Sequence, residues 1–130
     1  MVKMLVKGGN MMYNTVMLIG RLTANPEITK ADDKKDVCHV TLAVQRAYKN
    51  SDGVYEADFI RCTLWDQVAL RVKEYCQKGD LVSVRGQLKT STYEVNGEKK
   101  YSTEVVVERL AFLSSTPKQG QDEEKEEEEE

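Results

Sequence analysis

One stretch of the chain, residues 57–65 (ADFIRCTLW), alternates in the manner of a β-strand and constrains what the rest can form around it. One face of this strand is suited to a core and carries Ile60, Cys62 and Leu64. The other face combines two aromatic rings with a guanidinium and carries Phe59, Arg61, Thr63 and Trp65. Unpaired bases stack on aromatic rings and their phosphates attract positive charge, so this face predicts a surface for single-stranded nucleic acid. The alternative is that the two rings cover a second core, beneath a helix or a partner subunit.

Length and composition indicate one soluble domain with a polar appendage. The chain has 130 residues, of which 40% are hydrophobic and 32% charged, and this length is enough for one domain with a core. No apolar run approaches the roughly 18 residues of a membrane helix, so no membrane association is expected. The three cysteines, Cys38, Cys62 and Cys76, lack CxxC spacing and are expected to be reduced, buried thiols of a cytoplasmic protein.

Charge is divided unevenly along the chain. Residues 121–130 hold eight acids and one lysine, a net charge of −7, whereas the whole chain carries −3. Subtracting the −7 leaves +4 on residues 1–120, so the body is mildly basic and the tail strongly acidic. We predict an extension or disordered N-terminus at 1–11 with a native start at Met12, a folded domain at 12–114 and a disordered acidic tail at 115–130.

The folded part predicts three strands, a helix and two more strands. The strands are expected at residues 14–23, 37–49, 57–65, 81–89 and 101–113. Asp66 is expected to cap the helix and Gly79 to stop it, while residues 24–27 turn and 30–36 form a charged loop. Residues 50–53 and Asn96-Gly97 are expected to form hairpin turns. This order is typical of a mainly β fold, the OB-fold, which is a five-stranded Greek-key barrel with one helix between strands 3 and 4.

Six segments, in this order, resemble the bacterial single-stranded DNA-binding proteins. They are NTVMLIGRL (14–22), TLAV (41–44), ADFIRCTLW (57–65), YCQKG (75–79), VRGQLKT (84–90) and YSTEVVV (101–107). The resemblance covers residues 13–113. It implies an OB-fold, a homotetramer and sequence-independent binding of single-stranded DNA in replication, repair, recombination or DNA uptake. It also implies a cytoplasmic, nucleoid-associated protein without catalytic residues or a cofactor.

The resemblance also assigns candidate contacts. Four aromatics match the family's base-stacking positions, namely Tyr48, Phe59, Trp65 and Tyr93. Arg61 and Lys78 match its basic contacts, and Lys49 and Lys89 stand where members are often basic. The full set of phosphate candidates is Arg21, Lys49, Arg61, Lys78, Lys89, Lys99 and Lys100. Tyr48 has the parity of the core residues, so it needs strand twist or a bulge to reach the binding face.

The sequence leaves two functions open besides DNA binding. A structural or interaction module with an OB-fold, such as a primosome assembly factor, is the main alternative. A nuclease is less favoured, because the lone His39 has no ligand partners at metal-binding spacing and no metal site is expected. Family tails commonly end in a hydrophobic tip with Pro-Phe that docks repair enzymes, whereas this chain ends in five glutamates. Such docking is therefore not expected. Either the chain is a truncated or specialised member of the family, or the acidic run competes with DNA for the basic face, or it only keeps the protein soluble.

Overall fold

The computed structural model describes residues 12–115. The predicted extension at 1–11 and the predicted acidic tail, except for Ser115, lie outside the described residues. Within the described part, no helix is long and apolar enough to cross a membrane.

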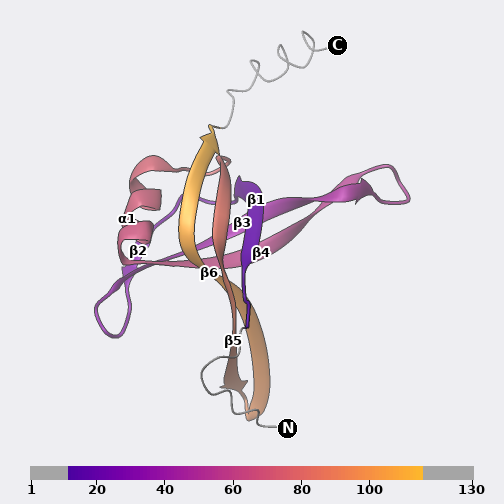
Figure 1. Ribbon diagram of the computed structural model, residues 1–130. Helices are drawn as coiled ribbons and strands as arrows, with labels where there is room; N and C mark the ends of the chain where they lie inside the picture. The colour runs from indigo at the N-terminus through magenta and orange to yellow at the C-terminus, as the bar shows by residue number, and fades with distance from the viewer. Residues whose placement is uncertain (1–11, 116–130) are drawn as a thin grey trace.

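Six strands and one helix make up the described chain (Figure 1). They are β1 (Val16–Leu22), β2 (Ile28–Lys30), β3 (Asp36–Lys49), β4 (Tyr55–Trp65), α1 (Asp66–Tyr75), β5 (Leu81–Val95) and β6 (Glu98–Ser114). The predicted order is confirmed, with the short β2 as an addition. The loop predicted at residues 30–36 is wrong at both ends, because Lys30 is the last residue of β2 and Asp36 is the first of β3. Three residues are too few to show strand alternation, and β2 is held by pairing with β3.

A ring of strands closes the barrel. The strand order β1-β5-β6-β4-β3 is completed by a β1–β3 pairing, while β2 adds to the outer edge of β3. Two junctions in this ring are short. The β1–β3 junction pairs Arg21 with Ala43 and Leu22 with Leu42, and the parallel β4–β6 junction pairs Cys62 with Val105 and Thr63 with Val106. We call these two junctions the seams. The predicted five-stranded OB-fold barrel is therefore confirmed.

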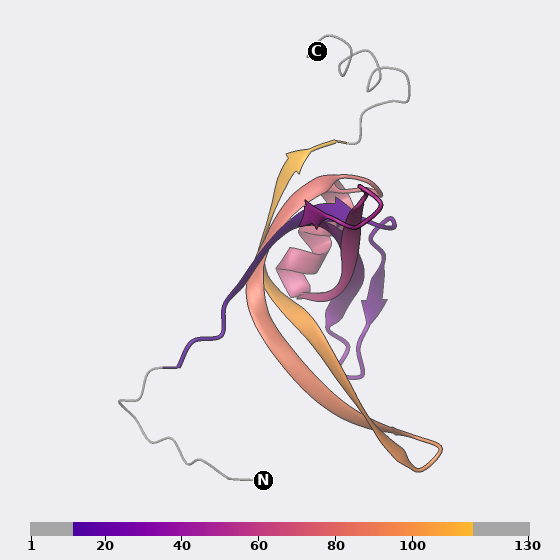
Figure 2. The same cartoon turned by 90° about the vertical axis from the view of Figure 1, so that its right-hand side faces the viewer.

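The core lies inside the barrel and is built by strand alternation. Its least exposed strand residues, each at most 2% exposed, include Leu22, Leu42, Leu64, Val82, Val84 and Val105. Helix α1 adds Ala69 and Val72 from its apolar face. Figure 2 shows the strands curving round a common interior with α1 against it. The close fit leaves no room at Gly86 of β5, where an added Cβ would stand 2.1 Å from the Val106 carbonyl oxygen.

Two hairpins extend beyond the barrel as arms (Figure 1). The β5–β6 arm is longer than predicted, because strand pairing continues from Lys89 to the turn at Asn96-Gly97. The turn itself is confirmed: both residues have positive φ, 52° and 82°, as a type I′ turn requires. The β3–β4 arm turns at residues 50–53, where the Asn50 side chain accepts the backbone N–H groups of Asp52 and Val54.

Both predicted helix termini are wrong. Trp65 occupies the N-cap position without a capping side chain, and Asp66 is the first helical residue, with φ of 51°. The helix ends at Tyr75, and the Cys76 N–H still bonds to the Val72 carbonyl. Gly79 lies further along, and its N–H donates to the Leu22 carbonyl at 2.8 Å. The chain leaves the helix early because the segment before β5 bonds to the end of β1.

The three cysteines are free and buried, as expected. Burial raises the pKa of each thiol, and raises that of Cys62 to about 11. At about pH 8, close to the ordinary pKa of a thiol, little reactive thiolate is therefore present in the folded state. We expect a chromogenic disulfide reagent to react slowly with the native protein and fast with all three thiols in denaturant. Rapid labelling of the native protein would contradict this burial.

Candidate nucleic-acid interface

Strand β4 turns its aromatic side outward. Pairing of β3 with β4 sets Phe59 beside Ala43, Arg61 beside Thr41 and Thr63 beside His39, all on the side opposite the core. Phe59 is 69% exposed and Trp65 37%, and Arg61 is also exposed. Thr63 is the exception at 2% exposed. Thus the two rings and the guanidinium predicted from the sequence do not cover a second core within the chain.

This outward side continues across both seams. One cross-strand row runs Arg21, Ala43, Phe59 over β1, β3 and β4. Another runs His39, Thr63, Val106, Gln87 over β3, β4, β6 and β5. Two predicted contacts from different strands, Arg21 of β1 and Phe59 of β4, therefore share a surface with the rest of the outward side of β4. We call this surface the aromatic face, and its candidate contacts are Arg21, Phe59, Arg61, Trp65, Lys89, Tyr93 and Lys100.

Two shallow hollows lie along the aromatic face. The first has a volume of about 270 Å³ and lies beside Trp65, with Gln87, Lys89 and Val106 among its lining residues. The second, of about 430 Å³, is lined in part by Arg21, Ala43 and Tyr55. Each hollow thus combines an aromatic ring with a basic side chain. That is the combination required to hold a base together with its phosphate.

Register divides the candidates on the β5–β6 arm between its two sides. Lys89 pairs with Glu104, and Tyr93 with Lys100, so these four share the side that continues the aromatic face. Lys99 pairs with Glu94 on the opposite side, together with Tyr101. Tyr93 is 50% exposed and Tyr101 75%. The structure therefore separates Lys99 from the other candidates of this arm.

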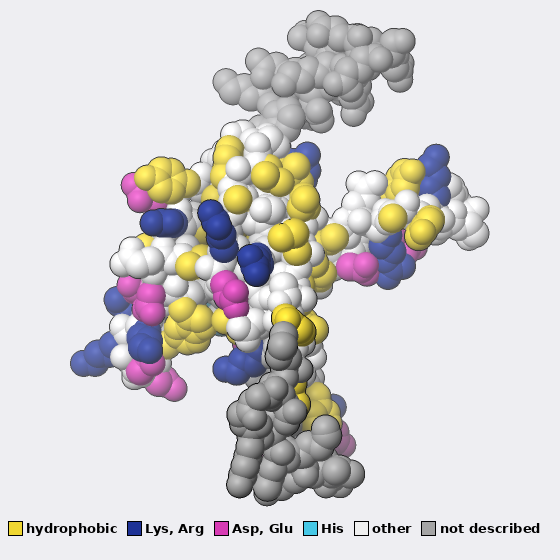
Figure 3. Space-filling model, viewed as in Figure 1, with side chains coloured by type: hydrophobic (Ala, Val, Ile, Leu, Met, Phe, Trp, Pro, Cys, Tyr) yellow, Lys and Arg dark blue, Asp and Glu magenta, His cyan; other side chains and the backbone are white. Residues whose placement is uncertain are grey.

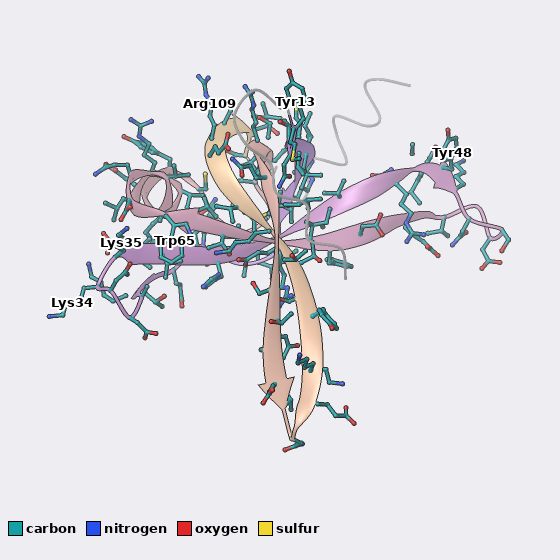
Figure 4. The ribbon with its side chains drawn as sticks, turned by 60° about the horizontal axis from the view of Figure 1, so that its bottom comes forward. Tyr13, Lys34, Lys35, Tyr48, Trp65 and Arg109 are labelled. Carbon is teal, nitrogen blue, oxygen red and sulfur yellow. The ribbon has the colours of Figure 1, made fainter. Side chains whose placement is uncertain are left out.

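The β3–β4 arm carries Tyr48 and Lys49 away from the other candidates. Figure 4 shows Tyr48 far out on the arm and Trp65 at the other end of β4. The register shifts between Gln45 and Lys49, which is the bulge that Tyr48 was expected to need, and Tyr48 is 85% exposed. The Lys49 ammonium lies 5.5 Å from the centre of the Tyr55 ring. Tyr55 is an exposed aromatic that the sequence analysis did not single out.

Arg46 braces this arm from within. Its guanidinium donates to Asp58 at 2.8 Å and to Glu56 at 2.9 Å, and Asn50 donates to the other oxygen of Glu56. The hydrogen bond to Asp58 raises the pKa of Arg46 and lowers the pKa of the Asp58 carboxyl. Two carboxylates thus neutralise this arginine. Arg46 is therefore not a candidate for phosphate contact, although its residue type alone would have suggested that role.

Lys78 and Arg21 meet near the end of β1. The Arg21 guanidinium donates to the Gly79 carbonyl at 2.9 Å, which holds the guanidinium beside the turn that carries Lys78. Lys78 is exposed, and its backbone N–H donates to the Asn25 side chain. This turn is therefore a basic spot at one edge of the aromatic face.

Sequence reasoning missed several groups near Trp65. Thr63 donates to Glu104 at 2.6 Å and lies 3.2 Å from the His39 Nδ1 atom. Lys34 and Lys35 lie in the loop between β2 and β3, and Val37, which follows it, pairs with Trp65 (Figure 4). The charged composition of residues 30–36 was the available signal. Figure 3 shows lysines and arginines spread over the barrel and the β3–β4 arm rather than gathered in one patch.

Within the described residues, no group of three or more His, Cys, Asp or Glu side chains could hold a metal ion. The aromatic face instead offers rings, cations and hydrogen-bonding groups to a ligand.

Comparison with known proteins yields consistent matches. Residues 13–113 match the single-strand binding protein family. The chain is 44% identical over 109 residues to "Single-stranded DNA-binding protein B" of Bacillus subtilis, covering 83% of this chain and 96% of that protein. It is 45% identical over 104 residues to "Single-stranded DNA-binding protein 2" of Streptococcus agalactiae, covering 80% and 79%. Among solved structures, "Plasmodium falciparum SSB complex with ssDNA" matches with a TM-score of 0.71 and 27% identity, covering 82% of this chain and 99% of that one.

Proposed function

The chain belongs to the single-strand binding protein family, and from this we propose that it binds single-stranded DNA through the aromatic face without sequence preference. The observation that carries the proposal is the outward side of β4, where Phe59, Arg61 and Trp65 alternate with core residues. The proposed activity is binding alone, with no chemical step and no cofactor. By coating exposed strands it protects them during replication, repair, recombination or DNA uptake.

Stacking accounts for the absence of sequence preference. Every base has a π-face, and one base stacked on an aromatic side chain contributes roughly 1–3 kcal/mol. Phe59, Trp65 and Tyr93 supply such rings along one surface, and Tyr48 supplies a fourth on the β3–β4 arm. A strand that follows these rings gains affinity whatever its sequence.

Phosphate contacts supply the charge-dependent part of the affinity. Arg61 stands between the two rings of β4, and Arg21 and Lys89 line the flanking hollows. Lys78, Lys100 and Lys49 extend the basic path, and Lys99 is the weakest candidate because it lies on the far side of its arm. Each neutralised phosphate changes the logarithmic salt slope by roughly −0.7 for a single strand.

We also propose a homotetramer. Met17 is 70% exposed and Ile19 55%, and both project outward from β1. Adjacent large apolar side chains on a surface are typical of a protein–protein contact. Self-association would cover Met17 and Ile19. Since Ile19 also lines the second hollow, the proposed subunit contact would border the DNA surface. We place the activity in the cytoplasm, at the nucleoid, where the proposed ligand is found.

Trp65 fluorescence provides the direct test. It is the only tryptophan in the chain, so the signal has one source. During titration with oligo-dT we expect quenching that saturates, and more oligomer is required for the same quenching as the salt concentration rises. Absence of quenching in protein shown to be folded would remove Trp65 from the site. An interaction module that works through protein contacts would then become the leading function.

Substituting each of the two tyrosines of the β5–β6 arm distinguishes the loss of base stacking from a general effect of changing an exposed tyrosine on oligo-dT affinity. Tyr93→Ala is expected to weaken oligo-dT binding by roughly 1 kcal/mol or more, because it removes one stacking ring. Tyr101→Ala removes the same ring from the opposite side of the arm and is expected to leave affinity unchanged. Equal losses in the two variants, measured at one salt concentration, would mean that register does not select the contacts.

A further inference from the structure

A carboxylate lies within the aromatic face, where an anionic ligand is proposed to bind. Glu104 of β6 stands in register with Lys89 of β5, and its Oε2 atom accepts the Thr63 hydroxyl at 2.6 Å. Thr63 itself lies between Arg61 and Trp65 on the outward side of β4. The register therefore places Glu104 next to Lys89 and on the same surface as Arg61 and Trp65. A negative charge at this position weakens phosphate binding. The position of the Glu104 carboxylate must therefore be explained by something other than phosphate binding.

Hydrogen bonding holds this carboxylate in one orientation. An ionised carboxylate only accepts, so the single Thr63 hydroxyl proton points to Glu104. The Thr63 oxygen is then left to accept from His39, whose Nδ1 atom lies 3.2 Å away and donates in the Nδ1–H tautomer. The 2.6 Å distance is typical of a charge-assisted bond. Since the chain of donors runs one way, from His39 through Thr63, Glu104 is a prearranged acceptor.

The carboxylate retains acceptor capacity toward solvent. Glu104 is partly exposed, and within residues 12–115 its only hydrogen bond is the one from Thr63. A carboxylate offers about four lone-pair sites on two oxygens. Both oxygens can therefore accept from a ligand while Oε2 keeps its bond to Thr63. The group that fits is a pair of adjacent N–H donors.

Guanine alone among the DNA bases presents such a pair. Its Watson–Crick edge carries N1–H beside the N2 amino group, and this edge is open in a single strand. Adenine and cytosine offer an amino group beside a ring acceptor, and thymine offers one N–H between two carbonyls, so each places an acceptor against the carboxylate. We propose that Glu104 gives the otherwise sequence-blind face a local preference for guanine, by accepting its N1–H and N2–H groups.

The same charge orients the strand. Glu104 repels phosphate, while Arg61 and Lys89 on either side attract it. A strand bound here therefore directs a base edge toward Glu104 and its phosphates toward the flanking cations. The inference rests on the proposed function, because the preference can act only on a strand that the rings and cations already hold.

Deoxyinosine supplies a matched probe, since it is guanine without the N2 amino group. Three oligomers are compared by Trp65 fluorescence: oligo-dT, oligo-dT with dG at every fourth position, and the same oligomer with deoxyinosine in place of dG. We expect the wild-type protein to bind the dG oligomer about fivefold more tightly than the deoxyinosine oligomer, as a specific base-edge contact implies. In Glu104→Gln the amide still accepts from Thr63 but presents N–H to the base, so the ratio is expected to fall to about one.

The control is Glu74→Gln on the exposed side of α1, which removes the same charge away from the aromatic face. It is expected to keep the wild-type ratio, and thermal melts of both variants check that the fold is retained. Equal binding of dG and deoxyinosine by the wild-type protein would overturn the inference. So would a preference that survives Glu104→Gln. Loss of oligo-dT binding itself would instead refute the proposed function.

Discussion

The double variant Phe59→Ala/Trp65→Ala is expected to lose roughly 2–6 kcal/mol of binding free energy for oligo-dT, which is about thirtyfold or more in affinity. Each substitution removes one stacking ring. The two residues are six positions apart on one strand, roughly 20 Å, so their losses are expected to add. Fluorescence anisotropy of a labelled oligo-dT measures the affinity, because the double variant has no tryptophan.

A matched control makes this result specific. Tyr75 on α1 is as exposed as Phe59, at 69%, but it lies outside the aromatic face. Tyr75→Ala is expected to bind oligo-dT with wild-type affinity. Circular dichroism checks that all variants fold. Wild-type affinity in a folded double variant would mean that DNA binds elsewhere on the protein.

Gly86→Ala is expected to destabilise the protein by about 3 kcal/mol, the upper part of the range for overpacking a well-packed interior. The added methyl would stand 2.1 Å from the Val106 oxygen and 2.9 Å from its carbonyl carbon. Both atoms belong to the backbone of the paired strand, so no side-chain rotation relieves the overlap. The midpoint of thermal unfolding is expected to fall by roughly 12–24 °C, measured at one protein concentration.

Gly97→Ala is the control variant that distinguishes steric crowding, expected at Gly86, from backbone strain at positive φ. Gly97 has a φ of 82° and nothing within 4 Å of an added Cβ. Its substitution costs only the conformational strain of an L-residue at positive φ, about 1–2 kcal/mol. If Gly86→Ala proves no more destabilising than Gly97→Ala, strands β5 and β6 are able to separate locally at no great cost.

Local patterns were sufficient for most of the barrel. The alternation of residues 57–65 correctly placed Cys62 and Leu64 in the core, and Asn96-Gly97 correctly marked a turn. The outer half of the β5–β6 arm was not predictable in this way. Its side chains are exposed on both sides, so its strand conformation depends on cross-strand pairing and leaves no alternation to detect. The C-terminal end of the helix was missed because hydrogen bonds between residues 79–80 and the end of β1 determine the path of the chain there.

For the candidate site, the direction of the β4 side chains could be predicted from the sequence, but their neighbours on other strands could not. The outward direction of Phe59, Arg61 and Trp65 followed from strand parity. The hydrogen-bond partner of Thr63, in contrast, is Glu104, which is 41 positions away in the sequence. Lys99 and Lys100 look equivalent in the sequence, and only the register with Glu94 and Tyr93 assigns them to opposite sides of the arm. The contacts themselves remain predictions.

The seams divide the barrel into two shells, one made of β1, β5 and β6 and the other of β3 and β4. Each seam has only two ladder pairs, supplemented by hydrogen bonds between Thr23 and Thr41 at one seam and between Thr63 and Glu104 at the other. Strand pairing is therefore thinnest at the seams, and we expect the barrel to open there first. A DNA strand that touches both Arg21 and Phe59, or both Trp65 and Lys89, would lie across a seam. Such a ligand stabilises the closed barrel, because it binds only the closed form and shifts the equilibrium between closed and open forms toward the closed one. Coating a strand would then protect the protein from opening as well as the DNA from attack.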